Sequence, residues 1–289
     1  MNKVVLITGT STGIGLYTSI LLAKHGCTVY ASMRDTGKKE LLQSEAEANG
    51  VTLNIVQLDV QVEESIRECI KNITEKEDRL DVLVNNAGAG FLRTAEQATM
   101  EEIEDVMDVN FMGAVRCIKS VLPQMRMQKS GHIINISSVG GLVGQPLNEI
   151  YCAAKFALEG FTESIATYMQ PYFGINVSLI EPGGVTTEFG NSVMKYIENT
   201  GGIKEDAYSP LMCDYMEYRK TFSDPELRAK VFQTPQQVAE VILQCIEDEK
   251  PKLRYLTSTW AAEFTQLKTA ADQNGVQLQA AVRKRILQK

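Results

Sequence analysis

The sequence predicts a single α/β domain, a doubly wound parallel sheet of about seven strands with helices on both faces. Short apolar runs alternate with longer segments of helical periodicity along most of the 289 residues. The apolar runs lack a strict alternation with polar residues, which is typical of strands covered on both faces. No repeat, low-complexity run or linker interrupts the pattern, so we expect one domain over 1–289 with right-handed crossovers.

The strands are expected at seven apolar runs, which are Val4–Thr8, Thr28–Ser32, Asn54–Gln57, Val82–Asn85, His132–Ser137, Asn176–Glu181 and Leu253–Leu256. Helices are expected between them, near 14–25, 37–48, 63–77, 100–127, 152–169 and 235–247. Thr99 with Glu102 and Thr234 with Gln237 have the spacing of capping boxes, which predicts where two of these helices begin. Pro171 predicts the end of the helix at 152–169.

Two segments stand outside this alternation. Residues 188–233 carry little pattern but are rich in Met and Tyr, and we expect a substrate-binding insertion that folds over the ligand site. An ordinary pair of surface helices is the alternative. Residues 259–289 are expected to form a C-terminal extension.

The composition excludes several kinds of partner. The formal net charge of −7 argues against nucleic acid or an anionic membrane, because both require a basic face. The six cysteines include no CxxC pair, so the sequence predicts neither a metal site nor a disulfide framework. The apolar run at Val4–Ile7 is too short for a signal peptide, and no stretch is long enough to span a bilayer. We therefore expect a cytoplasmic protein that acts on a small molecule.

A glycine-rich turn joins the first strand to the first helix. Glycines here allow a tight turn in which backbone N–H groups approach a pyrophosphate, and the helix N-terminus adds donors and a partial positive charge. Because the turn lies in this strand–turn–helix context, it predicts a Rossmann-like dinucleotide site. The residues assigned to the cofactor in this turn are Gly9, Ser11, Thr12, Gly13, Ile14 and Gly15.

The end of the second strand predicts which dinucleotide binds. An acid there selects NAD, whereas a cation selects NADP through the 2′-phosphate. The strand tip carries no acid, and Arg34 lies one residue beyond it. A guanidinium can hold a phosphate bidentately, so we expect NADP(H). Asp35 is the counter-argument, because this acid could pair with Arg34 or repel the phosphate.

Two further strand ends lie where open α/β sheets bind ligands. Asp59, beside Val60, is expected to accept a hydrogen bond from the adenine amino group. Ala87 and Gly88 are small enough for the ribose to lie against the backbone. Asn86 is assigned to the cofactor site as well, although it could instead brace a turn.

Tyr151 and Lys155 are four residues apart, so they project from one helix face in adjacent turns. A free phenol has a pKa of about 10, and a neighbouring ammonium favours its ionised form. Ser138 precedes Tyr151 by thirteen residues at a strand end, where it can donate a hydrogen bond to a substrate oxygen. A Tyr-x-x-x-Lys pair alone is usually an exposed helical pair, so the prediction of an oxidoreductase depends on the combination.

In their order and spacing these motifs resemble the short-chain dehydrogenase/reductase superfamily in its single-domain form, over roughly residues 3–190 and more loosely through 258. The resemblance implies that Tyr151 is the proton donor and acceptor, that Lys155 tunes its pKa and holds the nicotinamide ribose, and that Ser138 orients the substrate. It also implies that Asn110 holds a water between Lys155 and solvent. The segment implied to face the nicotinamide and phosphates includes Pro182, Gly183, Val185 and Thr187.

Three segments, 29–35, 138–141 and 151–160, are similar to the branch of 17β-hydroxysteroid dehydrogenase type 1 and the retinol dehydrogenases. This likeness implies NADP(H) through Arg34 and a bulky apolar or aromatic ketone, aldehyde, keto ester or steroid- or retinoid-like substrate. The side chains expected to contact the substrate are Ser138, Tyr151, Gln145, Phe189 and Met194. The chain departs from the branch in 188–233, which lacks a steroid-specific His; we expect His25 and His132, which lie outside that segment, to be structural.

Two other functions remain compatible with this fold. A non-catalytic NADP(H)-binding regulator would usually lack the Tyr or the Lys, and an epimerase or dehydratase would need a longer substrate domain. We also expect a homodimer or homotetramer, because the helices at 100–127 and 152–169 carry apolar residues such as Phe156, Phe161 and Ile165. Packing within the core is the alternative explanation of these three residues.

Overall fold

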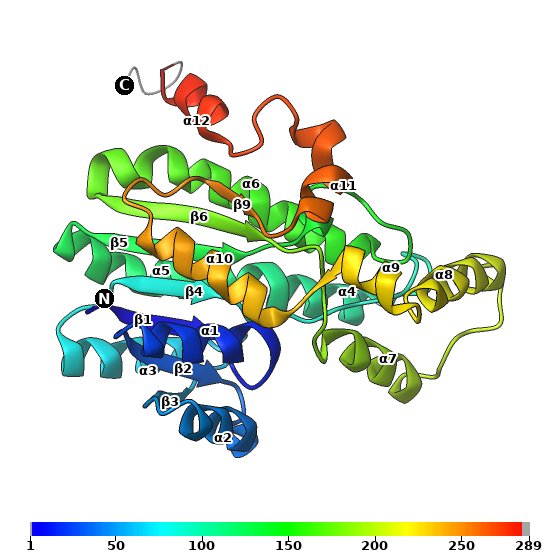
Figure 1. Cartoon of the computed structure of the whole chain (residues 1–289), viewed down its shortest axis with the longest axis horizontal. Coiled ribbons are helices and arrows are strands. Elements are labelled where there is room, and N and C mark those ends of the chain that lie inside the picture. The colour runs from blue at the N-terminus through cyan, green and yellow to red at the C-terminus, as the bar shows by residue number, and fades with distance from the viewer. Residues whose placement is uncertain (1, 285–289) are drawn as a thin grey trace.

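The computed structural model describes residues 2–284 and contains the predicted parallel sheet (Figure 1). Seven strands lie in the order β3-β2-β1-β4-β5-β6-β9, and each neighbouring pair is parallel. The strand order reverses between β1 and β4, which is the switch point where such sheets bind ligands. The strands are β1 (Val4–Thr8), β2 (Thr28–Met33), β3 (Asn54–Gln57), β4 (Val82–Asn85), β5 (Gly131–Ile136), β6 (Ile175–Glu181) and β9 (Arg254–Leu256).

Helices cover both faces of the sheet and enclose two cores. On one face, Leu6 and Ile133 pack with side chains of α3, α5 and α6. Their chain neighbours Val5 and Ile134 point to the opposite face and pack under α1, α2 and α10, as the period of two along a strand requires. The helices are α1 (Gly13–Lys24), α2 (Glu40–Ala48), α3 (Glu63–Glu77), α4 (Met100–Met107), α5 (Gly113–Gln128), α6 (Glu149–Phe173) and α10 (Pro235–Glu247).

Three predicted helices differ from the structure. The helix expected at 37–48 begins with a 3-10 turn over Thr36–Lys38, and α2 itself starts at Glu40. The helix expected at 100–127 is interrupted by a π-helical turn over Asp108–Met112, which separates α4 from α5. The predicted end at Pro171 is wrong, because α6 continues to Phe173. A proline leaves one carbonyl of the preceding turn without its N–H partner. Arg283 Nε donates to that carbonyl, the oxygen of Thr167, at 2.9 Å, and the helix runs on to its C-cap.

Residues 188–233 form three helices beside the carboxyl ends of the strands (Figure 1). They are α7 (Phe189–Asn199), α8 (Ser209–Thr221) and α9 (Pro225–Val231). The chain segments before and after these helices pair in a two-stranded parallel sheet, made of β7 (Gly184–Val185) and β8 (Phe232–Gln233). A small apolar cluster joins α7 and α8 to the main domain through Leu92 and Leu147. We call these three helices the lid.

The C-terminal part contains α11 (Thr259–Thr269) and α12 (Val276–Val282), and residues 285–289 of the predicted extension lie outside the described residues. No helix among residues 2–284 has both the length and the apolar character needed to cross a bilayer. Of the three residues cited for subunit contacts, Ile165 lies in a core and Phe161 packs against the same core. Phe156 alone of the three is exposed, at 36%. Core packing therefore explains two of the three.

Candidate active site

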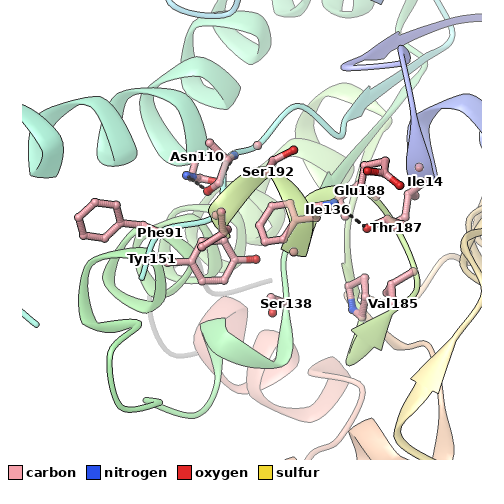
Figure 2. Close-up of a pocket in the computed structure, with 18 of the residues that line it drawn as sticks. Ile14, Phe91, Asn110, Ile136, Ser138, Tyr151, Val185, Thr187, Glu188 and Ser192 are labelled. Atoms are coloured by element: carbon pink, nitrogen blue, oxygen red, sulfur yellow. Dashed lines mark hydrogen bonds between the residues drawn. The ribbon is translucent and has the colours of Figure 1, made fainter. Parts of the chain in front are cut away.

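One cavity of about 780 Å³ lies at the carboxyl ends of the strands, between the sheet and the lid. It is lined by nearly all the residues assigned from the sequence to cofactor, catalysis and substrate. In Figure 2, Ile14, Thr187, Glu188 and Val185 lie on one side and Tyr151, Phe91 and Asn110 on the other, with Ser138 below. One cavity therefore contains both the glycine turn and the phenol of Tyr151.

The glycine turn adopts a conformation that glycine permits and other residues do not. Gly9 has φ 70°, and a Cβ on it would stand 2.8 Å from the Ala87 Cα. A Cβ on Gly15 would stand 2.4 Å from the Gly9 carbonyl oxygen. The Thr12 side chain makes no cap hydrogen bond, so it leaves the first N–H groups of α1 available to an anion.

Asn86 shapes this turn from the end of β4. Its Nδ2 donates to the carbonyl oxygens of Thr8, at 2.9 Å, and Gly9, at 2.8 Å. The Thr8 hydroxyl in turn accepts hydrogen bonds from the backbone N–H groups of Asn86 and Ala87. Asn86 lines the cavity, but its amide nitrogen donates both of its hydrogen bonds to the glycine turn. These bonds brace the turn, which is the alternative role given for Asn86 above.

At the far end of β2, Arg34 is exposed and lines the cavity. Asp35 does not pair with it in the described structure, and the Asp35 carboxylate accepts from Gly37 N at 2.9 Å. Within residues 2–284, Arg34 forms no ion pair at all. The Arg34 guanidinium is therefore free to meet an anion.

Asp59 and Val60 also line the cavity. Asp59 Oδ1 accepts from Gln61 N at 3.0 Å.

Ser138 and Tyr151 meet where β5 ends and α6 begins. Ser138 Oγ accepts from Gly140 N at 3.0 Å, which leaves the hydroxyl proton for another acceptor. Burial raises the pKa of Tyr151 to about 12, and the hydrogen bond from Ser138 opposes that rise. At neutral pH Tyr151 therefore holds its proton, the form that can protonate a substrate oxygen.

Lys155 is buried one turn beyond Tyr151. Its Nζ donates to the Ile136 carbonyl oxygen at 3.0 Å and lies 5.7 Å from the centre of the Tyr151 ring. Burial lowers the pKa of Lys155 to about 8, while the field of Glu159 opposes this. The Ile136 carbonyl at the end of β5 thus holds the Lys155 ammonium beside the Tyr151 ring.

Asn110 lies in the π-helical turn, a feature that often marks functional sites. Its Nδ2 donates to the carbonyl oxygens of Ala89 and Val106, both at 2.9 Å. A Cβ on Gly88 would stand 2.9 Å from Asn110 Oδ1 and 3.8 Å from Lys155 Nζ, so these three residues meet. The sequence motif located Asn110 but gave no sign of the turn that places it.

The segment 182–187 connects the sheet to the lid. Val139 N donates to the Pro182 carbonyl oxygen at 2.9 Å, which ties this segment to the turn that carries Ser138. Gly183 packs against Trp260, and Gly13 lies against Thr187. The segment, including Val185, therefore spans the space between the glycine turn and Ser138.

The residues assigned to the substrate fall partly in the cavity. Gln145 and Phe189 line it, and the Phe189 ring meets the Tyr151 ring edge-on with centroids 5.8 Å apart. Met194 lies outside it and packs in the cluster between lid and domain, while its neighbour Val193 takes the place expected of Met194. An aromatic and apolar wall completes the cavity, and three of its members, Tyr196, Tyr215 and Tyr218, come from the Met- and Tyr-rich segment expected to fold over the ligand site. The sequence did not single out the rest, which are Phe91, Leu92, Phe222, Phe232 and Trp260. Trp260 follows the last strand, a position that could have marked it as facing the ligand.

Comparison with known proteins agrees with this geometry. Residues 3–197 match the family described as short chain dehydrogenase. Retinol dehydrogenase 8 of Bos taurus is 42% identical over 277 residues, which cover 94% of this chain and 86% of that protein. The 17-beta-hydroxysteroid dehydrogenase type 1 of Homo sapiens is 38% identical over 261 residues, which cover 88% of this chain and 77% of that protein.

Solved structures show the same fold. A short-chain dehydrogenase from Streptomyces avermitilis aligns with a TM-score of 0.74 and 27% identity, covering 99% of this chain and 98% of that one. A short chain dehydrogenase/reductase from Burkholderia phymatum, in complex with NAD, aligns with a TM-score of 0.77 at 23% identity, covering 96% and 95%. The chain therefore belongs to the short-chain dehydrogenase family, oxidoreductases that act on CH–OH groups with NAD(P).

Proposed function

We propose that the protein is an NADP(H)-dependent carbonyl reductase that interconverts a bulky apolar or aromatic ketone or aldehyde and its alcohol. The observation that carries the proposal is one cavity with Ser138, Tyr151 and Lys155 at one end and the glycine turn and Arg34 at the other. The names of the relatives, retinol dehydrogenase 8 and 17-beta-hydroxysteroid dehydrogenase type 1, support an apolar substrate.

The residues present fit NADP(H). The close approach of Gly9 and Gly15 to neighbouring backbone leaves no room for side chains, and the uncapped start of α1 offers N–H groups to a pyrophosphate. Arg34 offers a guanidinium that forms no ion pair in the described part of the chain, 2–284, for a 2′-phosphate, and the Asp35 carboxylate accepts from Gly37 N. When bound, the nicotinamide of NADPH supplies the hydride for the carbonyl carbon.

Tyr151 and Ser138 handle the carbonyl oxygen. The Ser138 hydroxyl donates the hydrogen bond that orients this oxygen, since a carbonyl oxygen can only accept, and the bond from Gly140 N holds Ser138 Oγ in place. Tyr151 gives the oxygen a proton, since burial keeps the phenol protonated at neutral pH. In alcohol oxidation the Tyr151 phenolate, stabilised by the Lys155 ammonium, takes the proton from the alcohol.

Lys155 stabilises the phenolate that Tyr151 becomes after it has given up its proton. Its ammonium is fixed by the Ile136 carbonyl oxygen and faces the Tyr151 ring, and a positive charge in this position favours the ionised phenol. Its remaining N–H groups can hold the hydroxyls of the nicotinamide ribose.

The aromatic wall supports the proposed substrate class. The wall combines Phe91, which lies beside Tyr196 of α7, with Tyr215 and Tyr218 on α8, Phe222 at the C-cap of α8, and Trp260 at the start of α11. Aromatic side chains recognise flat, apolar ligands through large contact areas and offset or edge-on ring contacts. A ring system or a polyene that carries a carbonyl at one end has this shape.

A substrate panel tests the proposal. Oxidation of NADPH is followed by absorbance with retinal, ketosteroids, aryl ketones and keto esters, and NADH serves as the matched cofactor control. We expect turnover of at least one bulky apolar carbonyl, with NADPH preferred. No turnover of any of these carbonyls despite tight NADPH binding would favour the non-catalytic regulator.

A further inference from the structure

A buried ionic cluster lies directly behind the proposed catalytic residues. Arg254 on β9 contacts three carboxylates: Glu181 at the end of β6 through Nη1 at 3.2 Å, Glu159 on α6 through Nη2 at 3.0 Å, and Glu163 one turn farther along α6. The side chains of Arg254, Glu159 and Glu181 are 6%, 6% and 0% exposed, while Glu163 is 37% exposed. Two fully buried carboxyl groups thus share one guanidinium.

The charges of this cluster do not balance unless it holds a proton. Two buried carboxylates and one guanidinium leave a net negative charge in a medium that solvates it poorly. Burial raises the pKa of both Glu159 and Glu181, and their proximity to each other raises that of Glu181 further. Within residues 2–284, Glu181 Oε2 and both carboxyl oxygens of Glu159 lack a hydrogen-bond partner, so the two groups cannot both stay ionised here. The pKa of Glu159 is raised to about 7 and that of Glu181 is raised well above its usual value, which places the shared proton on Glu181.

Glu159 connects this cluster to Lys155. The two residues are four apart on α6, so they lie on one helix face in adjacent turns. Both border Gly141, because a Cβ on that glycine would stand 2.9 Å from Glu159 Cγ and 3.1 Å from the Lys155 carbonyl oxygen. The field of Glu159 raises the pKa of Lys155 against the lowering caused by burial.

The other groups packed around Lys155 in the described structure carry no charge at neutral pH. They are the Tyr151 phenol on α6, Asn110 in the π-helical turn, Gly88 after β4 and the Ile136 carbonyl at the end of β5. Arg254, Glu163 and Glu181 lie on the far side of Glu159, in contact with it or with its partner Arg254. Of the charged groups in this region, Glu159 is the one whose field acts on the Lys155 ammonium, from one turn away on α6.

We propose that Glu159 is a positioning residue of the reaction: its carboxylate, held ionised by Arg254 and by a proton on Glu181, keeps Lys155 positively charged. This inference rests on the proposed function, since it acts through Lys155 and Tyr151. It assigns different roles to two neighbouring glutamates, because Glu159 supplies the charge and Glu181 supplies the proton that keeps that charge in place.

The test compares Glu159→Gln with Glu181→Gln. Both replace a buried glutamate of one cluster by a neutral amide of the same shape. The readout is the pH dependence of kcat/KM for carbonyl reduction with NADPH, whose alkaline limb reports loss of the Lys155 proton. For Glu159→Gln we expect this limb to move to lower pH by about one unit. For Glu181→Gln we expect it to stay, because the amide N–H replaces the donor of the protonated acid.

Asp81→Asn is the matched control, because Asp81 is a buried, ion-paired carboxylate at the opposite end of the sheet. It should lower the melting temperature without moving the limb. If Glu159→Gln does not fold, the double variant Glu159→Met/Arg254→Met removes both charges together and carries the same expected shift. Equal shifts in the two glutamine variants, or no shift in Glu159→Gln, would overturn the proposal. Activity retained in Tyr151→Phe would instead overturn the proposed function, so the two failures are distinct.

Discussion

Gly9 lies so close to Ala87 that a Cβ on Gly9 would stand 2.8 Å from the Ala87 Cα. This approach joins the end of β1 to the end of β4 and forms the floor of the proposed dinucleotide site. Because both contact surfaces are backbone, neither can move aside without reshaping the turn.

Gly9→Ala should therefore impair both stability and cofactor binding. The residue has φ 70°, so alanine adds backbone strain to the clash, and we expect a loss of about 3 kcal/mol in unfolding free energy with NADPH binding weakened at least tenfold. Gly50→Ala is the control, because Gly50 has φ 65° but nothing within 4 Å of its Cβ position. It should cost about 1 kcal/mol in urea unfolding and leave the Kd of NADPH unchanged. Similar effects of the two variants on NADPH binding would contradict the assigned role of the turn.

Arg34→Glu should reverse the proposed preference for NADPH. Removing a charge-assisted contact to the 2′-phosphate costs about 2 kcal/mol, and the new acid can accept from a ribose hydroxyl. Titration should show NADPH affinity falling about thirtyfold or more, with NADH affinity little changed. Lys38→Glu makes the same change of charge four residues away, outside the cavity lining, and should affect both cofactors slightly. Equal losses for the two cofactors in Arg34→Glu would show that the phosphate is not read there.

Phe189→Ala should affect large substrates more than small ones. The ring meets Tyr151 edge-on at 5.8 Å and is 42% exposed, which places it over the reacting groups at the edge of the lid. Loss of this ring contact should raise KM for a bulky aromatic ketone about tenfold and leave kcat for a small aldehyde within about twofold. An equal change for both substrates would argue that Phe189 supports the fold rather than substrate binding.

His132 should make the protein less stable in acid. It is fully buried, its Nε2 lies 3.0 Å from Ser178 Oγ, and burial lowers its pKa from 6.5 to about 3. Between these values the unfolded chain binds a proton that the folded chain does not, so this histidine's contribution to stability falls as pH decreases from about 6.5 to 3. The slope is about 1.4 kcal/mol per pH unit.

Urea unfolding of wild type and His132→Gln at pH 7 and pH 5 measures this contribution. The variant should be less stable at pH 7 and should lose less on acidification, by about 2 kcal/mol. Parallel losses in the two proteins would mean that His132 does not carry the acid sensitivity.

Much of the fold could be predicted because local sequence determines it. The capping boxes at Thr99 and Thr234 are present in the structure, and the strand ranges agree closely. The continuation of α6 past Pro171 could not be predicted, because the carbonyl left unpaired by the proline is satisfied by Arg283, 116 residues farther along the chain. Contacts of that range leave no periodic signal.

In the site, too, short-range sequence patterns could be predicted and long-range contacts could not. The glycine turn and the Tyr–Lys pair are short-range patterns, and the structure brings them into one cavity. Val193 lines the cavity where Met194 was expected. Which face of the lid helix α7 points into the cavity depends on how the helix packs on Leu92, and the local sequence does not determine that packing. Arg254 and Glu181 come together only through strand pairing. NADP selectivity, the residue roles, the cytoplasmic location and the homo-oligomeric state stay predictions.

The most direct test of the account is the Tyr151→Phe variant in single-turnover reduction with saturating NADPH. Because only the phenolic oxygen is removed, we expect the hydride-transfer rate to fall by about 10²–10⁴-fold. The Kd of NADPH and the melting temperature should stay near their wild-type values. A rate that stays near wild type would contradict the central claim that Tyr151 supplies the proton.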